Sequence, residues 1–163
     1  MYNDLVIDEE SHNTWFDQVI SDVSKRYWII QIDYAPVGVA NLTNIDPRSL
    51  RCDWAFYIAD ESARGKGVGA ATEFIVLEYA FYELGLQKVC CEVIKGNDAV
   101  VAMHQNFGFK IEGTFRSHIV KDGRRVAVLA LGLLKSEWNF SREESRERLI
   151  ERGAISPSGA YFA

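Results

Sequence analysis

Six residues, Arg64-Gly65-Lys66-Gly67-Val68-Gly69, have the types and spacing of an anion-binding loop. Three glycines at alternate positions remove side chains from one turn, so backbone N–H groups can lie directly against a ligand. The apolar stretch that follows is typical of a helix, whose first N–H groups and positive dipole end also favour anions. Arg64 and Lys66 add positive charge at the rim, which suits a pyrophosphate better than a single carboxylate. We therefore expect this loop to bind a phosphorylated ligand.

Two other nucleotide-binding motifs also use glycine-rich loops. A Walker loop needs Gly-Lys followed by Ser or Thr, and here two alanines follow the last glycine, which excludes that motif. Gly65, Gly67 and Ala70 do fit the dinucleotide-binding fingerprint. Glu92 lies at a suitable distance to hold a ribose, although the polar residues 60–64 separate the preceding strand from the first glycine. Dinucleotide binding therefore stays an alternative.

The elements that position this loop follow from hydrophobic periodicity and turn chemistry. In order, we expect a helix broken near Ser11 (1–25), strands 27–32, 37–42 and 52–59, a core helix 68–84 stopped by Gly85, strand 88–94, a helix 97–106, and a hairpin of strands 112–120 and 125–134 with Asp-Gly at its tip. The helical crossover makes strands 52–59 and 88–94 parallel, whereas the other pairs are antiparallel. This is an α/β (α+β) fold with a mixed, mostly antiparallel sheet and helices on both faces.

The C-terminal part is expected to lie outside that sheet. Residues 141–152 are strongly charged and begin with the capping pattern Ser141-x-x-Glu144, which predicts a solvated or fraying helix. We therefore divide the chain into one domain, 1–138, and a tail, 139–163.

The glycine loop and the segment after strand 88–94 together resemble the GNAT superfamily of N-acetyltransferases. The family's Arg/Gln-x-x-Gly-x-Gly/Ala loop is matched by Arg64, Gly67 and Gly69. Its second motif, Asn-x-x-Ala-x-x-x-Tyr-x-x-x-Gly-Phe, is matched by Asn97, His104, Gly108 and Phe109, with Ala99 one place early. The resemblance spans roughly residues 26 to 134. It implies the GNAT fold, with two central parallel strands that splay apart, and acetyl-CoA as the co-substrate.

The resemblance also implies roles for individual residues. The pantetheine arm of acetyl-CoA would pair with the free edge of strand 52–59 as a short extra strand. The implied cofactor-binding set is Tyr57, Ile58, Ala59, Arg64, Gly65, Lys66, Gly67, Val68, Gly69 and Asn97. His104 stands where the family has the tyrosine that protonates the departing thiolate, and an imidazole can do this near neutral pH. A histidine packed beside the strand and satisfied by a backbone carbonyl is the alternative.

Two carboxylates are candidates for taking a proton from the acceptor amine, directly or through water. We favour Glu92, because a carboxylate among Cys, Val and Ile side chains would be desolvated unless it had a function. Asp53 is the second candidate and is placed with the substrate. An ion pair of Glu92 with Lys88 or Arg116 is the structural alternative.

Other side chains near the expected cleft are assigned to the surface or the core. Glu73 and Glu78 are expected to be solvated helix residues. Cys90 and Cys91 have no basic neighbour that would activate a thiol, so we read them as core residues and favour direct attack over a covalent intermediate. Trp54 either forms a wall of the binding site for a sugar or nucleobase, or it packs in the core.

Two segments, 110–123 and 131–138, resemble the branch of the family that acetylates nucleotide-linked amino sugars in pseudaminic acid biosynthesis. The implied acceptor is the 4-amino group of a UDP-linked amino-deoxy sugar, with Arg116, His118 and Lys121 near its diphosphate. Hairpin surface charge is the alternative for these three residues. Part of the same segment resembles ribosomal-protein N-terminal acetyltransferases, so another small amine stays open as the acceptor. A non-catalytic acyl-CoA-binding module is the alternative from a different class.

Composition sets the remaining expectations. A length of 163 residues with 48% apolar side chains fits one domain with a real core. The formal net charge of −5 argues against a nucleic-acid partner. The three cysteines are odd in number and lack Cys-x-x-Cys spacing, so neither a disulfide framework nor a metal site is expected. With no apolar run of membrane-spanning length and no signal peptide in evidence, we expect a cytoplasmic protein without a membrane partner.

The first strand of the family fold has no counterpart in this sequence, which enters midway through the family's first helix. Strand 27–32 would then be an exposed sheet edge, and edge pairing could make a homodimer.

Overall fold

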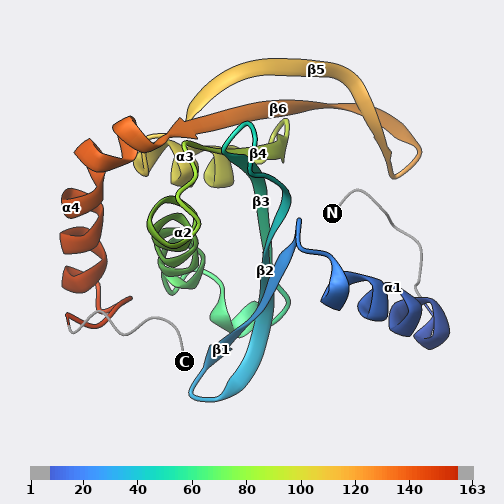
Figure 1. Cartoon of the computed structure of the whole chain (residues 1–163), viewed down its shortest axis with the longest axis horizontal. Helices are drawn as coiled ribbons and strands as arrows, with labels where there is room; N and C mark the ends of the chain where they lie inside the picture. The colour runs from blue at the N-terminus through green and yellow to red at the C-terminus, as the bar shows by residue number, and fades with distance from the viewer. Residues whose placement is uncertain (1–7, 158–163) are drawn as a thin grey trace.

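The computed structural model describes residues 8–157, so the predictions for residues 1–7 and 158–163 lie outside it. In order, its elements are α1 (Glu9–Ser21), β1 (Arg26–Ile32), β2 (Ala35–Asp46), β3 (Arg51–Ile58), the 3-10 turn η1 (Glu61–Ala63), α2 (Val68–Glu78), the π-helical turn η2 (Tyr79–Glu83), β4 (Lys88–Ile94), α3 (Asp98–Asn106), β5 (Lys110–Lys121), β6 (Arg124–Leu134) and α4 (Lys135–Glu151). Figure 1 shows them arranged around one sheet.

The sheet has six strands in the order β1-β2-β3-β4-β6-β5. Only β3 and β4 are parallel, because α2 carries the chain back between them, and the other neighbours are antiparallel. The β1–β2 and β5–β6 hairpins close through two residues with positive φ, Asp33-Tyr34 and Asp122-Gly123, as tight hairpin turns require. The predicted mixed sheet, the parallel pair and the Asp-Gly tip are confirmed.

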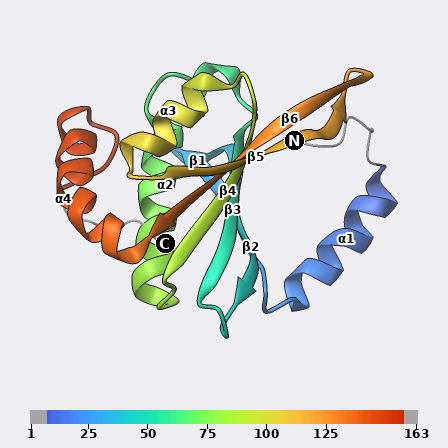
Figure 2. The same cartoon turned by 90° about the horizontal axis from the view of Figure 1, so that it is seen from above.

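Helices cover both faces of the sheet, as predicted. Figures 1 and 2 show α2, α3 and α4 on one side and α1 on the other. The main core lies between the sheet and α2, and its fully buried side chains include Leu42, Phe74, Leu77, Phe81, Val89, Leu131 and Trp138. Burial around α2 explains why its sequence is apolar on most sides. The helix continues through η2 and stops before Gly85, whose φ of +67° confirms the predicted helix end.

The N-terminal helix differs from the prediction at its start. The cap of α1 is Asp8, whose side chain accepts a hydrogen bond from the Ser11 N–H at 2.7 Å. Ser11 therefore lies inside the helix rather than at a break, because the carboxylate three residues earlier already satisfies its N–H. Trp15 of α1 meets Tyr27 of β1 edge-on, with ring centroids 5.2 Å apart.

The last helix also starts earlier than predicted. α4 begins at Lys135, where the Glu137 carboxylate accepts from the Leu134 N–H at 3.0 Å. Ser141 is therefore not an N-cap, and its hydroxyl instead donates to the Phe107 carbonyl at 3.0 Å. The helix is also less solvated than expected, because its inner face buries Trp138, Ser145 and Leu149. It crosses residue 138, and the division of the chain there stays a prediction.

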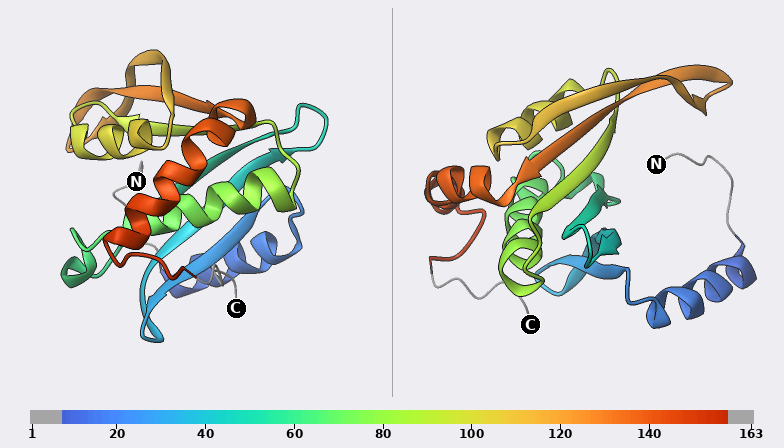
Figure 3. Two further views of the ribbon diagram at one scale, coloured as in Figure 1. Left: turned by 90° about the vertical axis from the view of Figure 1, so that its left-hand side faces the viewer. Right: turned by 45° about the horizontal axis from the view of Figure 1, so that its top comes forward.

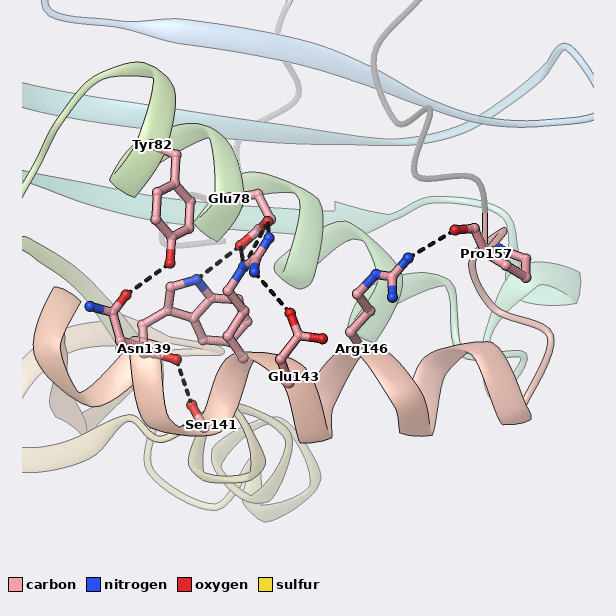
Figure 4. Close-up of polar contacts among 9 residues, drawn as sticks. Glu78, Tyr82, Asn139, Ser141, Glu143, Arg146 and Pro157 are labelled. Atoms are coloured by element: carbon pink, nitrogen blue, oxygen red, sulfur yellow. Dashed lines mark hydrogen bonds and ion pairs between the residues drawn. The ribbon is translucent and has the colours of Figure 1, made fainter.

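Polar contacts join α4 to α2, which lie side by side in Figure 3. The Arg142 guanidinium donates to both oxygens of Glu78, at 2.8 Å from Nε and 2.6 Å from Nη2, and the Trp138 indole N–H donates to the same carboxylate at 3.1 Å. Nearby, the Tyr82 hydroxyl donates to Asn139 at 2.8 Å (Figure 4). The prediction of a solvated Glu78 is therefore wrong, because α4 covers it.

Candidate active site

The parallel strands separate soon after they meet. β3 and β4 pair only at Arg51–Lys88, Cys52–Val89 and Asp53–Cys90, and beyond these pairs their facing edges diverge. The predicted splay is thus present. A cavity of about 960 Å³ occupies it and takes much of its lining from the two strands, from Arg51 and residues 53–58 on β3 and from Lys88 and residues 90–94 on β4.

Strand alternation assigns the lining residues to two faces of the sheet. On β3, Cys52 and Trp54 point toward α2 and are buried, so Asp53 points to the opposite face. Because Asp53 is the register partner of Cys90, Glu92 lies on that same opposite face. The cavity therefore reaches both faces through the gap between the strands.

The glycine loop sits beside this cavity at the start of α2. Gly65 and Gly67 have φ of +75° and +81°, the left-handed region in which a side chain is disfavoured. No side chain caps α2, so its first-turn N–H groups are left for a ligand, as an anion cradle requires. Arg64 lines the cavity, and its Nη2 donates to the Ile58 carbonyl at 3.3 Å. Lys66 is exposed.

Gly69 has a packing role in addition to its predicted place in the loop. It lies in the first turn of α2, where a Cβ would sit 3.1 Å from the Phe56 ring of β3. Its missing side chain therefore lets α2 pack closely on β3, and its contact with a ligand stays a prediction.

His104 reaches the cavity from α3 and is paired with a buried carboxylate. It is 3% exposed, and its Nδ1 lies 2.7 Å from Oε1 of Glu73 on α2, which is 0% exposed. The prediction of a solvated Glu73 is wrong, because this face of α2 packs against the sheet and α3. Burial raises the pKa of Glu73, and the hydrogen bond and charge of His104 partly offset that rise. The partner of His104 is thus a carboxylate rather than the backbone carbonyl of the alternative interpretation.

The two candidate bases are placed differently from each other. Glu92 lines the cavity but is exposed, so the expectation that it is desolvated is wrong. Asp53 is half-buried, and one oxygen accepts a hydrogen bond from the Asn44 amide at 2.7 Å. Arg51 lies 3.9 Å from its other oxygen. Both carboxylates face the cavity from the side opposite α2.

The cavity brings together only part of the expected site. The predicted residues that line it are His104, Glu92, Tyr57, Ile58, Arg64, Asn97, Asp53 and Trp54. Trp54 is buried and stacks on Phe56 with centroids 5.2 Å apart, so it also packs in the core. Ala59 and residues 65–69 lie outside the lining. So do Arg116, His118 and Lys121, which are exposed on β5 around the irregular register after Phe115.

Sequence reasoning missed several lining residues, among them Asn44, Lys88 and Glu112. Lys88 of β4 donates to Glu112 of β5 at 2.7 Å, across the intervening β6. Gly132 of β6 leaves the room for this contact, because a Cβ there would lie 2.6 Å from a Glu112 oxygen. No local signal in the sequence links these three residues.

Two of the three cysteines behave as core residues. Cys52 and Cys91 are buried, and burial raises the pKa of the Cys52 thiol to about 12. Cys90 is half-buried and lines the cavity, so it is not a core residue. Burial raises the pKa of the Cys91 and Cys90 thiols as well. A raised pKa keeps a thiol protonated and weakly nucleophilic, which favours direct attack over a covalent intermediate.

The sequence matches the family model described as "Acetyltransferase (GNAT) domain" over residues 2–110. The chain belongs to the GNAT acetyltransferase family. It is 26% identical to the spermidine N(1)-acetyltransferase of Escherichia coli K12, over 83% of this chain and 73% of that one. This GNAT protein is also 29% identical to the acetyltransferase PseH of Campylobacter jejuni, over 64% of each chain.

Among solved structures, the spermidine N-acetyltransferase of Vibrio cholerae in complex with CoA and spermine superposes on this acetyltransferase with a TM-score of 0.80. The match has 20% sequence identity and covers 85% of this chain and 82% of the other. This similarity confirms the GNAT fold. Together, the family match and the N-acetyltransferase relatives make the protein an acyl-CoA-dependent N-acetyltransferase.

Two further findings concern the part of the acetyltransferase that the structure describes. No helix between residues 8 and 157 is both long and apolar enough to cross a membrane. Over the same range, no cluster of three or more His, Cys, Asp or Glu side chains is placed to hold a metal ion.

Proposed function

We propose that this acetyltransferase moves the acetyl group of acetyl-CoA directly to a primary amine of a small, positively charged molecule. The opening between β3 and β4 carries the proposal, because it offers carboxylates on one sheet face and His104 on the other. A carboxylate can then take a proton from the attacking amine on one side of the acetyl carbonyl, while His104 gives a proton to the leaving thiolate on the other side.

Acetyl-CoA fits the residues beside and within this opening. The left-handed glycines 65 and 67 and the uncapped start of α2 suit a pyrophosphate. Beyond Asp53, the β3 edge that faces β4 is left unpaired and can pair with the amides of the pantetheine arm. Bound in this way, acetyl-CoA would supply a thioester carbonyl at the point where the strands diverge.

Side chains of the protein then accept and donate the protons of the reaction. Glu92 or Asp53 takes a proton from the acceptor ammonium, directly or through water, so that a neutral amine attacks. His104 gives a proton to the CoA sulfur as the C–S bond breaks. As the amide forms, the attacking nitrogen loses a second proton by the same route. One of the two protons released by the nitrogen restores His104 and the other passes to solvent, so the products are the N-acetylated amine, CoA with its thiol protonated and one proton.

The choice of a cationic acceptor rests on the relatives rather than on the charge of the cavity. Asp53, Glu92 and Glu112 line the cavity, but Arg51, Arg64 and Lys88 line it too, and Lys88 pairs with Glu112. The curated relative from Escherichia coli is named for spermidine, a small polyamine of this charge. A UDP-linked amino sugar has weaker support, since the three basic residues expected at its diphosphate lie outside the cavity lining.

The test is release of CoA thiol from acetyl-CoA over a panel of acceptors: spermidine, spermine, a ribosomal-protein N-terminal peptide and a UDP-linked amino sugar. We expect the polyamines to give the highest kcat/KM. Glu92→Gln should lower kcat/KM for them by at least about tenfold. The matched control Arg116→Ala, an exposed residue outside the cavity lining, should leave polyamine turnover unchanged.

Other outcomes have defined meanings. Turnover only of the UDP-linked sugar, lost in Arg116→Ala, would replace the polyamine with the amino sugar as the acceptor. Tight binding of CoA without turnover of any amine would support the non-catalytic acyl-CoA-binding module instead.

A further inference from the structure

The most unusual group in the molecule is the Glu73 carboxylate, which lies inside the protein behind His104. Glu73 is 0% exposed, and its Oε1 is 2.7 Å from the imidazole Nδ1. Its Oε2 is buried and finds no hydrogen-bond partner anywhere in residues 8–157. A half-satisfied buried carboxylate is costly, and an apolar side chain would fill this position on a core helix at lower cost. We therefore expect the glutamate at position 73 to have a functional role.

The groups around Glu73 and His104 indicate that the Glu73 carboxylate acts on the His104 imidazole. The Trp54 ring packs edge-on against the imidazole at 5.5 Å between centroids, and Phe109 packs at 5.4 Å. From β4, the Cys91 thiol is the other titratable group near the carboxylate, and burial keeps it protonated. Nδ1 is occupied by Glu73 while His104 lines the cavity, so Nε2 is the ring nitrogen left for a ligand.

We propose that Glu73 is the positioning residue for His104: it fixes the ring through Nδ1 and keeps a transferable proton on the buried Glu73–His104 pair for delivery through Nε2. This inference rests on the proposed acetyl transfer. It adds to that function a buried carboxylate that keeps the proton donor protonated.

Proton counting explains why burial favours this arrangement. With an ionised Glu73 and a neutral imidazole, the pair carries one negative charge inside the protein. With one more proton the pair is neutral overall, either as carboxylate and imidazolium or as carboxylic acid and imidazole. A low-dielectric interior penalises the charged pair and so favours the extra proton.

The chemical step balances in these terms. Nε2–H gives its proton to the CoA sulfur as the C–S bond breaks, and the proton shared with Glu73 ends on Nδ1. The pair is then anionic. The acceptor nitrogen gives up two protons through the solvent-facing carboxylates, one before attack and one as the amide forms; one of them restores the pair and the other passes to solvent. No oxidant, metal or other co-reactant enters.

The decisive variant is Glu73→Gln, because a Gln amide still bonds to Nδ1 and holds the ring but cannot stabilise an imidazolium. We expect kcat to fall at least about tenfold with little change in the KM for acetyl-CoA. The alkaline limb of the kcat profile should also move to lower pH. Glu83→Gln, an exposed glutamate on the following π-helical turn, is the matched control and should behave as wild type.

Coupling to His104 separates this role from a structural one. In a His104→Phe background, Glu73→Gln should cost no further activity, because the group it serves is gone. Equal losses in both backgrounds, or a loss that is the same at every pH, would overturn the proposal. Circular dichroism and the dissociation constant of CoA verify that each variant is folded.

A second readout does not need turnover. The chain has three histidines, and ¹⁵N NMR spectra of labelled protein at one fixed pH follow all three together. Glu73→Gln should change the Nδ1 and Nε2 signals of His104, whose hydrogen-bond partner changes, and leave those of His12 and His118, both exposed, in place. Unchanged His104 signals overturn the pairing. Changed signals in a protein that turns over no amine keep the pairing and reject the proposed function.

Discussion

Ala154, which follows α4, lies directly against Gly67 of the glycine loop. A Cβ on Gly67 would sit 3.2 Å from the Cβ of Ala154, and Gly67 itself has φ of +81°. The segment after α4 thus returns to the start of α2 and supports the loop, a contact between residues that are far apart in the sequence.

This contact predicts how acetyl-CoA binding responds to changes in the loop. Gly67→Ala should weaken CoA binding more than Lys66→Ala does. The alanine at position 67 must adopt a left-handed φ at a cost of about 1–2 kcal/mol and crowd Ala154. Lys66 is exposed and contributes only a screened charge. Isothermal titration of CoA measures both, and the cradle assignment is wrong if the folded Gly67→Ala protein binds as tightly as wild type.

Gly69 should affect CoA binding through packing. Gly69→Val places a branched side chain where a Cβ already approaches Phe56 to 3.1 Å, so we expect a loss of about 1–3 kcal/mol in the free energy of unfolding, together with weaker CoA binding. Gly113→Val is the control, since nothing lies within 4 Å of a Cβ there. Urea unfolding of both variants tests this, and similar stabilities would contradict the close α2–β3 approach.

His104 should act mainly on the chemical step. His104→Phe is expected to lower kcat about a hundredfold or more with little change in the dissociation constant of acetyl-CoA. His104→Tyr should recover a good part of that activity, because a phenol has a similar reach. Unchanged kcat in His104→Phe would leave water as the proton donor.

The two carboxylate partners of Arg142 should differ in their effect on stability. Glu78 is 16% exposed and also accepts from the buried Trp138 indole, whereas Glu143 is 63% exposed. Glu78→Ala should cost about 2–3 kcal/mol of unfolding free energy, because it leaves half-buried donors without an acceptor. Glu143→Ala should cost less than about 1 kcal/mol. Equal costs in thermal unfolding would show that the α2–α4 contact is not held by this pair.

The Cys52 thiol should react slowly and in a pH-dependent way. With its pKa raised from 9.0 to about 12, only about one thiol in ten thousand is ionised at pH 8. Because the folded pKa is the higher one, its contribution to stability is complete below pH 9.0 and is lost as the pH rises toward about 12. Labelling with a thiol reagent at pH 8, before and after denaturation, measures the protection. Rapid labelling of Cys52 in the native protein would contradict the core assignment.

Much of the fold could be predicted because its signals are local. The strand 88–94 and the stop at Gly85 depend on β-branched runs and turn residues within a few positions. The errors at Ser11 and Ser141 arose at helix starts, where several nearby side chains can serve as caps. The parallel pairing of β3 with β4 followed from the helical crossover between them.

The sequence by itself determined the glycine loop and the order of strands and helices, since each depends on spacing along the chain, whereas His104 was singled out by the resemblance to the GNAT family. Only the tertiary structure decided which carboxylates are buried. Glu73 and Glu92 look alike in sequence, yet one lies beneath α3 and the other faces solvent. Burial is set by what packs over a residue, and the partner of Glu73 lies 31 positions away on another helix. Such long-range contacts leave no periodic trace, so the Glu73–His104 pair becomes visible only when α2 and α3 meet on one face of the sheet.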